Sequence, residues 1–406
     1  MGTFLRLAWR NLWRNKKRTI IASSSVFFAV ILALGMRSIQ KGSYDFMIDS
    51  SVRISTGYIQ VHANGYWDKR SLDKSMIFDR SITSEIQQIP DITLVIPRLE
   101  TFTLVSHGNA TKVSPIMGIE PVKEINILRL KKKVVAGRYL TDSSRGILIG
   151  QGLAELLKAG VGDSLVLYGQ GFHGITAAAQ VPVEGIVKLP IPEMNKSMIY
   201  TSLSFAQWLY SAPGRITSLS IMISKPGSLD KIKSEVNRLF DDKFEVMTWQ
   251  EMTPELVQAI EVDSAGGIIM LGILYIVIGF GIFGTIMMMT AERTKEFGIL
   301  IAVGMKKSKL ILVTTFETIF ISLIGLFAGI AVSYPLLLYF YYHPIRLTGD
   351  LAEAMLAFGY EPLMPFSIAP GMFVAQFWTV LLIALLSAWY PFRYVQKLKP
   401  VEAIRN

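Results

Sequence analysis

Four long, almost uncharged stretches constrain the fold of this 406-residue chain more than any other feature. They cover residues 19–36, 264–291, 310–342 and 368–392, and Glu317 is the one charged residue within them. An α-helix needs about 20 apolar residues to cross the hydrocarbon core of a bilayer. We therefore expect four transmembrane helices, with one large polar segment between the first and the second.

The first stretch has a second interpretation, because a basic segment precedes it, as in a cleaved secretory signal peptide. The apolar core of a signal peptide is usually about 7 to 15 residues long. Residues 19–36 are longer than that, and no clear small-residue cleavage site follows them in polar sequence. We therefore expect an uncleaved membrane span.

The distribution of positive charge indicates the orientation of the spans. Segments 1–18, 292–309 and 393–406 together hold fifteen Lys and Arg residues and three acidic residues, whereas loop 343–367 holds one Arg and three acidic residues. Cytoplasmic loops are enriched in Lys and Arg. We therefore expect both termini and residues 292–309 on the cytoplasmic side, and residues 37–263 and 343–367 on the outer side. The net charge of +10 then marks topology, and we expect no nucleic acid as a partner.

Residues 37–263 have the polar composition of a folded soluble domain. Their alternating and amphipathic stretches predict strands and helices without the regular order of a parallel α/β fold. The expected fold class is a membrane protein with four transmembrane α-helices and a large α+β extracytoplasmic domain between helices 1 and 2. The expected strands are 58–63, 93–97, 100–106, 112–118, 163–168, 180–187 and 217–223, and the expected helices are 81–89, 152–158, 204–210 and 228–240.

The residues before the first span are themselves patterned. Arg6, Arg10 and Arg14 recur every four residues, opposite an apolar stripe that includes Trp9. This pattern is typical of a helix that lies on the inner leaflet with its arginines near anionic lipid. It is equally compatible with a basic anchor that only fixes the orientation of the first span. We expect residues 1–18 to form a cytoplasmic interfacial helix.

The composition argues against several classes of enzyme. The chain has no cysteine, so it has no thiolate metal site and no catalytic thiol. Its four histidines are not at the spacing of metal ligands, and no glycine is followed by lysine, as a nucleotide-binding phosphate loop requires. We therefore expect no catalytic residue, no metal site and no cofactor in this chain. If ATP powers the protein, another chain hydrolyses it.

Glu317 and a pair of glycines stand out inside the third span. A carboxylate within the bilayer is costly unless it is paired or close to the interface. Glu317 lies eight positions after Lys309, which is about 12 Å at 1.5 Å per residue, so it can lie in the inner headgroup zone or pair with a basic residue of a neighbouring helix. We favour a structural pair over a proton relay, because the four stretches hold no second acidic residue and no histidine to relay a proton to. Gly325 and Gly329 form a G-x-x-x-G motif, which predicts close packing between helices.

The loop 292–309 between the second and third spans combines charge with apolar residues. It begins with Glu292 and Glu296, continues with apolar residues that include Phe297 and Leu300, and ends in lysines. This order of charges suits the dipole of a short helix. Apolar residues exposed on the cytoplasmic side require something to cover them. We therefore expect a partner protein to bind this loop.

Four segments of the chain resemble the FtsX/MacB-type ABC transporter permeases. The loop ERTKEFGILIAVGMKKSKL (292–310) is similar to the family's cytoplasmic loop before the third span, where a pattern close to E-R-x-x-E-x-G-x-L-x-A-x-G occurs. The other three are LAWRNLWRNKKRTI (7–20), FETIFISLIGLFAG (316–329) and PFRYVQKLKPVEAIRN (391–406). Segments of the outer domain also follow the order expected for the family's periplasmic domain.

The resemblance implies a permease subunit that works with a separate ABC ATPase, which binds the ATP and Mg²⁺. It also implies a second four-span permease, which is either a second copy of this chain or a paralogue, and contact with membrane lipid. In the family, the loop after the second span forms a coupling helix that docks on the ATPase. The residues that correspond to it here are Glu292, Arg293, Glu296, Phe297, Gly298 and Gly304.

Within that family, the run GYIQVHANGYWDKRSLDKSM (57–76) is most similar to the lipoprotein-releasing (LolC/LolE) branch. This resemblance implies a multi-pass protein of the cell inner membrane that releases lipoproteins, or another amphipathic substrate, to a periplasmic acceptor. Two alternatives stay open. One is an FtsX-like regulatory permease that controls a periplasmic partner without transport, and the other is efflux of a small amphipathic compound.

Overall fold

The computed structural model describes residues 2–14, 16–125, 127–128, 130–189, 191–357, 361–399, 401 and 403. The closing motif from residue 400 on therefore lies outside the described residues, apart from residues 401 and 403. The chain forms two compact units. Unit 1 comprises Met1–Phe46, Ala259–Arg346 and Leu363–Asn406, and unit 2 comprises Met47–Gln258 and Leu347–Pro362.

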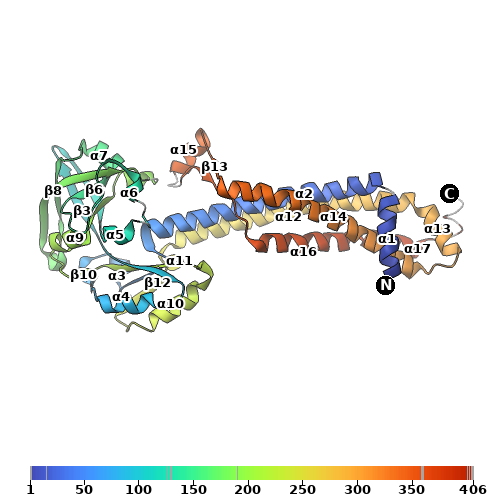
Figure 1. Ribbon diagram of the computed structural model, residues 1–406, viewed down its shortest axis with the longest axis horizontal. Coiled ribbons are helices and arrows are strands. Elements are labelled where there is room, and N and C mark those ends of the chain that lie inside the picture. The colour runs from blue at the N-terminus through green and yellow to red at the C-terminus, as the bar shows by residue number, and fades with distance from the viewer. Residues whose placement is uncertain are drawn as a thin grey trace. The chain divides into compact units, whose positions relative to one another are not determined.

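Unit 1 contains the apolar parts of four helices that are long and apolar enough to cross a membrane (Figure 1). The prediction of four membrane-spanning helices is thereby confirmed. The helices are α2 (Lys16–Ser51), α12 (Pro254–Glu292), α14 (Lys307–Tyr342), and α16 (Pro370–Ser387) followed directly by α17 (Trp389–Lys397).

The four helices share one apolar core, but they contribute to it unequally. Buried side chains from all four form one cluster, which includes Val30, Ile286, Leu326 and Val380. In α12 only 11% of the most apolar segment is buried, against 50% in α14. Lipid or another chain must therefore cover most of this apolar segment of α12.

Helices α2 and α12 are longer than the uncharged stretches that predict them. α2 continues beyond residue 36 to Ser51, and α12 begins at Pro254 rather than at residue 264. In this polar part a hydrogen bond from the Tyr44 hydroxyl to Asp263 Oδ2 (2.5 Å) joins the two helices. A stretch without charge measures the apolar, lipid-facing length, whereas backbone hydrogen bonds continue the helix beyond it. The boundaries expected at 36/37 and 263/264 are therefore not the ends of these helices.

Unit 2 contains a ten-stranded sheet. Its strands are β1 (Ile59–Ala63), β3 (Ile92–His107), β4 (Ala110–Ile119), β5 (Val134–Gly137), β6 (Ile147–Gly150), β7 (Ser164–Gln170), β8 (Thr176–Val187), β9 (Ile199–Ser202), β11 (Ser218–Ile223) and β12 (Phe244–Thr248). Two short ladders are separate from it, one of β2 (Met76–Ile77) with β10 (Arg215–Ile216), and one in unit 1 of β13 (Ile345–Arg346) with β14 (Leu363–Met364).

The long strand β3 belongs to two parts of this sheet. Its first half closes an antiparallel arrangement in the order β12, β1, β11, β3. Its second half pairs with β4 on one side and with β7 on the other. From there the pairs β4–β9, β9–β6, β6–β8 and β8–β7 complete a closed ring of six strands. A closed ring leaves no free strand edge within it.

Short helices accompany the strands of unit 2. The mixture of helices with mostly antiparallel pairs confirms the predicted α+β class, because β4–β9 and β6–β8 are the parallel pairs among the described strands. The helices are α3 (Tyr66–Lys69), α4 (Arg80–Gln87), α5 (Pro121–Glu124), α6 (Leu130–Lys133), α7 (Gln151–Leu157), α8 (Pro192–Asn195), α9 (Leu203–Leu209), α10 (Leu229–Asn237), α11 (Trp249–Met252) and α15 (Asp350–Ala357).

Strand β3 runs unbroken where the sequence predicts two strands. The predicted break falls at Arg98 and Leu99, yet both residues are buried within the strand. Arg98 donates from Nε to Glu124 Oε1 (2.6 Å) and from Nη2 to Glu124 Oε2 (3.1 Å). This two-point ion pair lets a charged residue occupy the interior of a strand, so the charge does not mark its end. In the ten-stranded sheet, strands β5, β6, β9 and β12 have no counterpart among the expected strands.

A buried histidine gives unit 2 a pH dependence. His62 on β1 is fully buried and stacks on the ring of Trp67, with the ring centroids 5.8 Å apart. Burial, assisted by the charge of Arg70, lowers the pKa of His62 from 6.5 to about 4. Because the folded-state pKa lies below the unfolded one, the contribution of neutral His62 to stability is complete above pH 6.5 and is lost as the pH falls toward 4.

We predict that lowering the pH from 7 to 5 removes about 2 kcal/mol of unit 2 stability through His62 alone. In His62→Phe this contribution is absent, so the variant should lose less stability than the wild type between the same two pH values. The measurement is urea unfolding of the full chain at pH 7 and pH 5, followed by tryptophan fluorescence. Equal losses in the two proteins would show that His62 does not carry the effect.

Candidate functional site

The loop between α12 and α14 folds into the short helix α13 (Thr294–Ala302) and a tight turn. Glu296 lies in the first turn of α13, where a negative charge suits the helix dipole. After the helix, Met305 N–H donates to the carbonyl oxygen of Leu300 (3.0 Å). Gly304 has φ 105°, a backbone conformation that residues other than glycine rarely adopt. The turn at Gly304 therefore sends the chain from α13 directly into α14.

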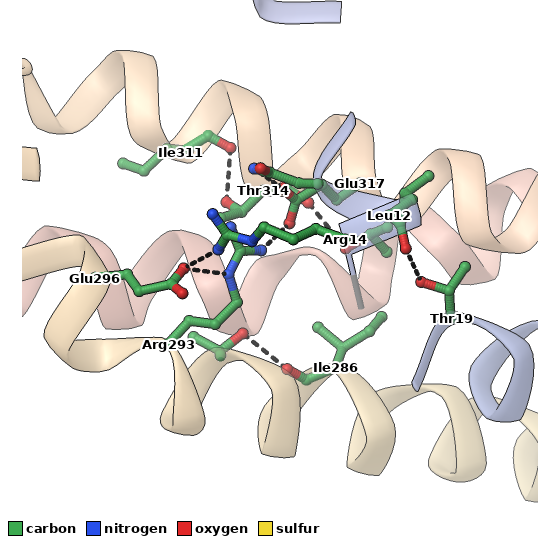
Figure 2. Close-up of polar contacts among 12 residues, drawn as sticks. Leu12, Arg14, Thr19, Ile286, Arg293, Glu296, Ile311, Thr314 and Glu317 are labelled. Carbon is green, nitrogen blue, oxygen red and sulfur yellow. Dashed lines mark hydrogen bonds and ion pairs between the residues drawn. The ribbon is translucent and has the colours of Figure 1, made fainter. Parts of the chain in front are cut away.

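A buried ion pair connects the start of this loop to α14 (Figure 2). Arg293, the residue just before α13, donates from Nη1 to Glu317 Oε2 at 2.5 Å. The side chains of Arg293 and Glu317 are only 9% and 7% exposed. Glu317 therefore has a cationic partner inside the bundle, from the junction of α12 and α13.

The N-terminal helix α1 (Gly2–Arg14) joins the same cluster. Asn11 Nδ2 donates to the other carboxylate oxygen, Glu317 Oε1, at 2.6 Å. Arg14 contacts Glu296 Oε2 at 2.6 Å, and Arg293 Nε lies 3.3 Å from the same oxygen. These contacts bring α1, the start of α13 and α14 together at one place, as Figure 2 shows. We call Asn11, Arg14, Arg293, Glu296 and Glu317 the polar cluster.

The contacts of the polar cluster differ in how much they contribute to the stability of the fold. The Arg14–Glu296 pair is about half exposed, and exposed ion pairs contribute about 0–1 kcal/mol. The Arg293–Glu317 pair is buried, so removing either partner leaves an uncompensated charge away from water. Arg18 and Glu292 form a separate, partly exposed pair at 2.5 Å. The buried pair therefore dominates the cluster.

Phe297 and Gly298 lie on the inner side of α13. Phe297 is 1% exposed and packs against Leu310 at the start of α14 and Val395 on α17. The expectation that Phe297 is exposed for a partner protein is therefore wrong. Its apolar ring is covered by the chain's own helices, because α13 folds back onto α14 and α17.

The outer side of α13 carries the apolar residues that remain uncovered. Ile299 and Leu300 are exposed, and Val303, in the turn that follows, is 83% exposed. We call Ile299, Leu300 and Val303 the apolar ridge. Val303 stands out from the other apolar residues of the loop only once the buried side of α13 is known.

The two glycines of the third span lie against α2. A Cβ atom at Gly325 would be 2.5 Å from the carbonyl oxygen of Ser23 and 2.6 Å from Val26 Cβ. At Gly329 it would be 2.8 Å from Val30 Cβ. All three distances are shorter than a van der Waals contact, so these positions let α14 approach the backbone of α2 closely. The G-x-x-x-G motif is thus used within one chain.

The six expected coupling residues therefore have different surroundings. Arg293, Phe297 and Gly298 are buried, Glu292 and Glu296 hold ion pairs at the surface, and Gly304 forms the turn. Asn11 was not among the expected site residues, although it is a polar residue on the otherwise apolar side of α1, between Ala8 and Leu12. That interruption is the signal in the sequence that could have identified it.

Two family descriptions match the chain. Residues 19–239, more than half of its length, match the MacB-like periplasmic core domain. Residues 268–400 match the FtsX-like permease C-terminal region. The first match covers the first span and most of unit 2, and the second covers the other three spans together with α13.

Individual relatives are similar over most of the chain. The lipoprotein-releasing system transmembrane protein LolC of Neisseria meningitidis serogroup B is 22% identical over 80% of this chain and 80% of its own length. The probable export ATP-binding/permease protein MacB of Pseudomonas entomophila is 20% identical over 98% of this chain, which spans 58% of the length of that relative. The crystal structure of the periplasmic region of MacB from Actinobacillus actinomycetemcomitans is 18% identical, with a TM-score of 0.36 over 52% of this chain and 95% of the other.

The buried ion pair makes a direct prediction about stability. Glu317→Gln leaves the guanidinium of Arg293 buried without a counter-charge, so we expect it to lower the free energy of unfolding by about 3–5 kcal/mol. Thermal unfolding of the purified full chain in detergent measures the loss. The matched control is Glu292→Gln, which removes the same charge from a partly exposed pair and should cost less than about 1 kcal/mol. Equal losses of unfolding free energy in the two variants would contradict the claim that the buried pair contributes more to stability than the partly exposed pair.

Proposed function

The chain belongs to the FtsX/MacB-like family of ABC-transporter permeases, and from that premise we propose that it transmits ATP-driven motion to its outer domain to release lipoproteins, or another amphipathic substrate, from the membrane. The family implies a partner ATPase, and the chain itself is a non-catalytic permease subunit.

The proposed orientation places both termini and α13 in the cytoplasm. The support is the concentration of Lys and Arg in segments 1–18, 292–309 and 393–406, which is the usual mark of the cytoplasmic side. ATP is available on that side, so an ATPase that docks on α13 has its substrate.

The observation that carries the docking proposal is the apolar ridge on the outer side of α13. Ile299, Leu300 and Val303 are exposed next to the polar cluster, and exposed apolar patches commonly mark protein interaction sites. Under this proposal the ATPase covers the ridge, while Phe297 and Gly298 hold α13 against the membrane helices. The position of α13 is then set by Glu292, Glu296 and Gly304. Their role is not limited to contact with the ATPase.

The buried pair then passes a displacement of α13 to the spans. Arg293 is held by Glu317 of α14 and directly follows α12, so α13 cannot shift without moving both helices. α12 is one unbroken helix of 39 residues from Pro254, in the outer domain, to Glu292. A helix of that length is about 58 Å long, which is enough to carry motion across a bilayer.

The substrate proposal rests on the similarity to the LolC protein, which extends over four-fifths of both chains. In this proposal a second four-span permease, either another copy or a paralogue, completes the complex, and a periplasmic acceptor receives the lipoprotein. A second candidate is export of a small amphipathic compound, which the match of 98% of this chain to the MacB protein favours. A regulatory permease without transport is the third alternative.

The docking proposal predicts the effect of a charge on the apolar ridge. Val303→Asp places a carboxylate where the ATPase would bury an apolar side chain, so we expect the affinity for the ATPase to fall at least about ten-fold. Co-purification and ATPase activity of the reconstituted complex measure this. Val113→Asp, at a position 66% exposed on β4, is the matched control and should leave both unchanged. Undiminished ATPase binding by Val303→Asp would place the docking site elsewhere.

The substrate proposal predicts what accumulates when the chain is depleted from its cell. Processed lipoproteins should remain in the inner membrane, because nothing releases them, and membrane fractionation measures this. Normal lipoprotein sorting would contradict release. Increased sensitivity to amphipathic compounds would then favour export. An envelope defect without increased sensitivity to these compounds would favour regulation. The effect of Val303→Asp on ATPase binding tests the docking site in either case.

A further inference from the structure

An apolar groove runs along unit 1 between the start of α14 and α17, and nothing in the proposed function uses it. Its volume is about 520 Å³, within the range of roughly 300–1,000 Å³ that ligand sites in proteins occupy. We propose that this groove binds an anionic phospholipid from the leaflet that borders the basic segments, with an acyl chain in the groove and the headgroup phosphate at Lys307, at the start of α14.

The lining of the groove suits an acyl chain. Ile311, Leu312 and Phe316 line it from α14, and Phe392 lines it from α17. From Lys307 to Phe316 the helix rises about 13 Å at 1.5 Å per residue. The groove therefore begins at the end of the span and continues to acyl-chain depth in the bilayer.

The mouth of the groove is basic through Lys307, which lines it. Lys306 and Lys309 lie on the same turn and add positive charge nearby without lining the groove, and the ammonium of Lys309 lies 5.7 Å from the ring centroid of Phe4. Across the part of the chain that the structure describes, none of these three lysines has a carboxylate oxygen within 4.0 Å. Lys307 Nζ donates to the carbonyl oxygen of Gln396 at 2.9 Å, which holds the ammonium at the mouth and leaves it further donors.

Helix α17 places the mouth at headgroup depth. Trp389 is exposed, its ring stacks on Phe392 with centroids 5.9 Å apart, and the guanidinium of Arg393 lies 5.0 Å from the Trp389 ring centroid. Exposed tryptophan beside arginine is typical of the membrane interface. Basic pockets between transmembrane helices on the cytoplasmic side are known to bind anionic headgroups.

These observations favour lipid over a protein segment as the occupant. A soluble ATPase reaches Lys307 at the mouth, but it cannot follow the groove to Phe316, because that depth is occupied by lipid chains. A phospholipid matches both ends of the groove, since its phosphate complements the ammonium of Lys307 and its acyl chain covers the apolar wall.

Native mass spectrometry of the purified full chain, with added phosphatidylglycerol or phosphatidylcholine of the same acyl composition, tests the proposal. We expect phosphatidylglycerol to bind in preference to phosphatidylcholine, and inorganic phosphate not to displace it. Lys307→Gln should weaken phosphatidylglycerol binding about five-fold, the effect of one lysine near a headgroup. Leu312→Trp, which fills the groove, should weaken both lipids at least ten-fold. The control Lys17→Gln removes an exposed inner-side charge away from the groove and should change binding less than two-fold.

Three results would overturn the proposal. Equal binding of the two lipids shows that the protein does not recognise the headgroup. An equal effect of Lys17→Gln and Lys307→Gln on phosphatidylglycerol binding shows general charge attraction. Unchanged lipid binding by Leu312→Trp, with weakened ATPase association, shows that the groove is a protein site. Thermal unfolding of each variant establishes that it is folded, and none of these outcomes depends on whether Val303 binds the ATPase.

Discussion

A carboxylate buried within a membrane helix has to be neutralised, and the basic end of unit 1 is arranged around the neutralisation of Glu317. Arg293 supplies the charge and Asn11 supplies a second hydrogen bond, so both carboxylate oxygens are satisfied. Because these partners come from the α12–α13 junction and from α1, satisfying one side chain joins three separate segments of the chain. An uncharged residue at 317 would require none of these contacts.

The buried pair also explains why α13 has two different sides. Its inner side is anchored by Arg293 and by the burial of Phe297 against α14 and α17. Its outer side is left with the apolar ridge, which is free to meet a partner. A short helix that is fixed on one side and exposed on the other can receive a force and pass it on, whereas a flexible loop with the same residues would absorb it. The proposed lipid groove lies between α14 and α17, so a bound lipid would contact two of the helices that hold α13.

How much of this could be predicted from the sequence depends on the range of the interactions. The four spans follow from uncharged length alone, since the bilayer acts on each segment separately. The α+β class follows from local periodicity. The ends of α2 and α12 do not, because polar pairs such as Tyr44–Asp263 extend the helices beyond the apolar stretch. The burial of Phe297 and the continuity of β3 through Arg98 cannot be predicted either, because each depends on a partner distant in the sequence. Phe297 packs against Val395, and Arg98 pairs with Glu124.

The central claim is that α13 and α14 move as one body because Arg293 and Glu317 join them. The chain has no cysteine, so two introduced cysteines carry spin labels without background. Labels at Ala302→Cys on α13 and Phe327→Cys on α14 allow their separation to be measured by electron spin resonance in the complex with its ATPase, with and without bound nucleotide. The account predicts the same distance distribution in both states, and a second, nucleotide-dependent distance only when Glu317→Gln is added. A shift of several ångströms between the two states in the protein with intact Glu317 would contradict it.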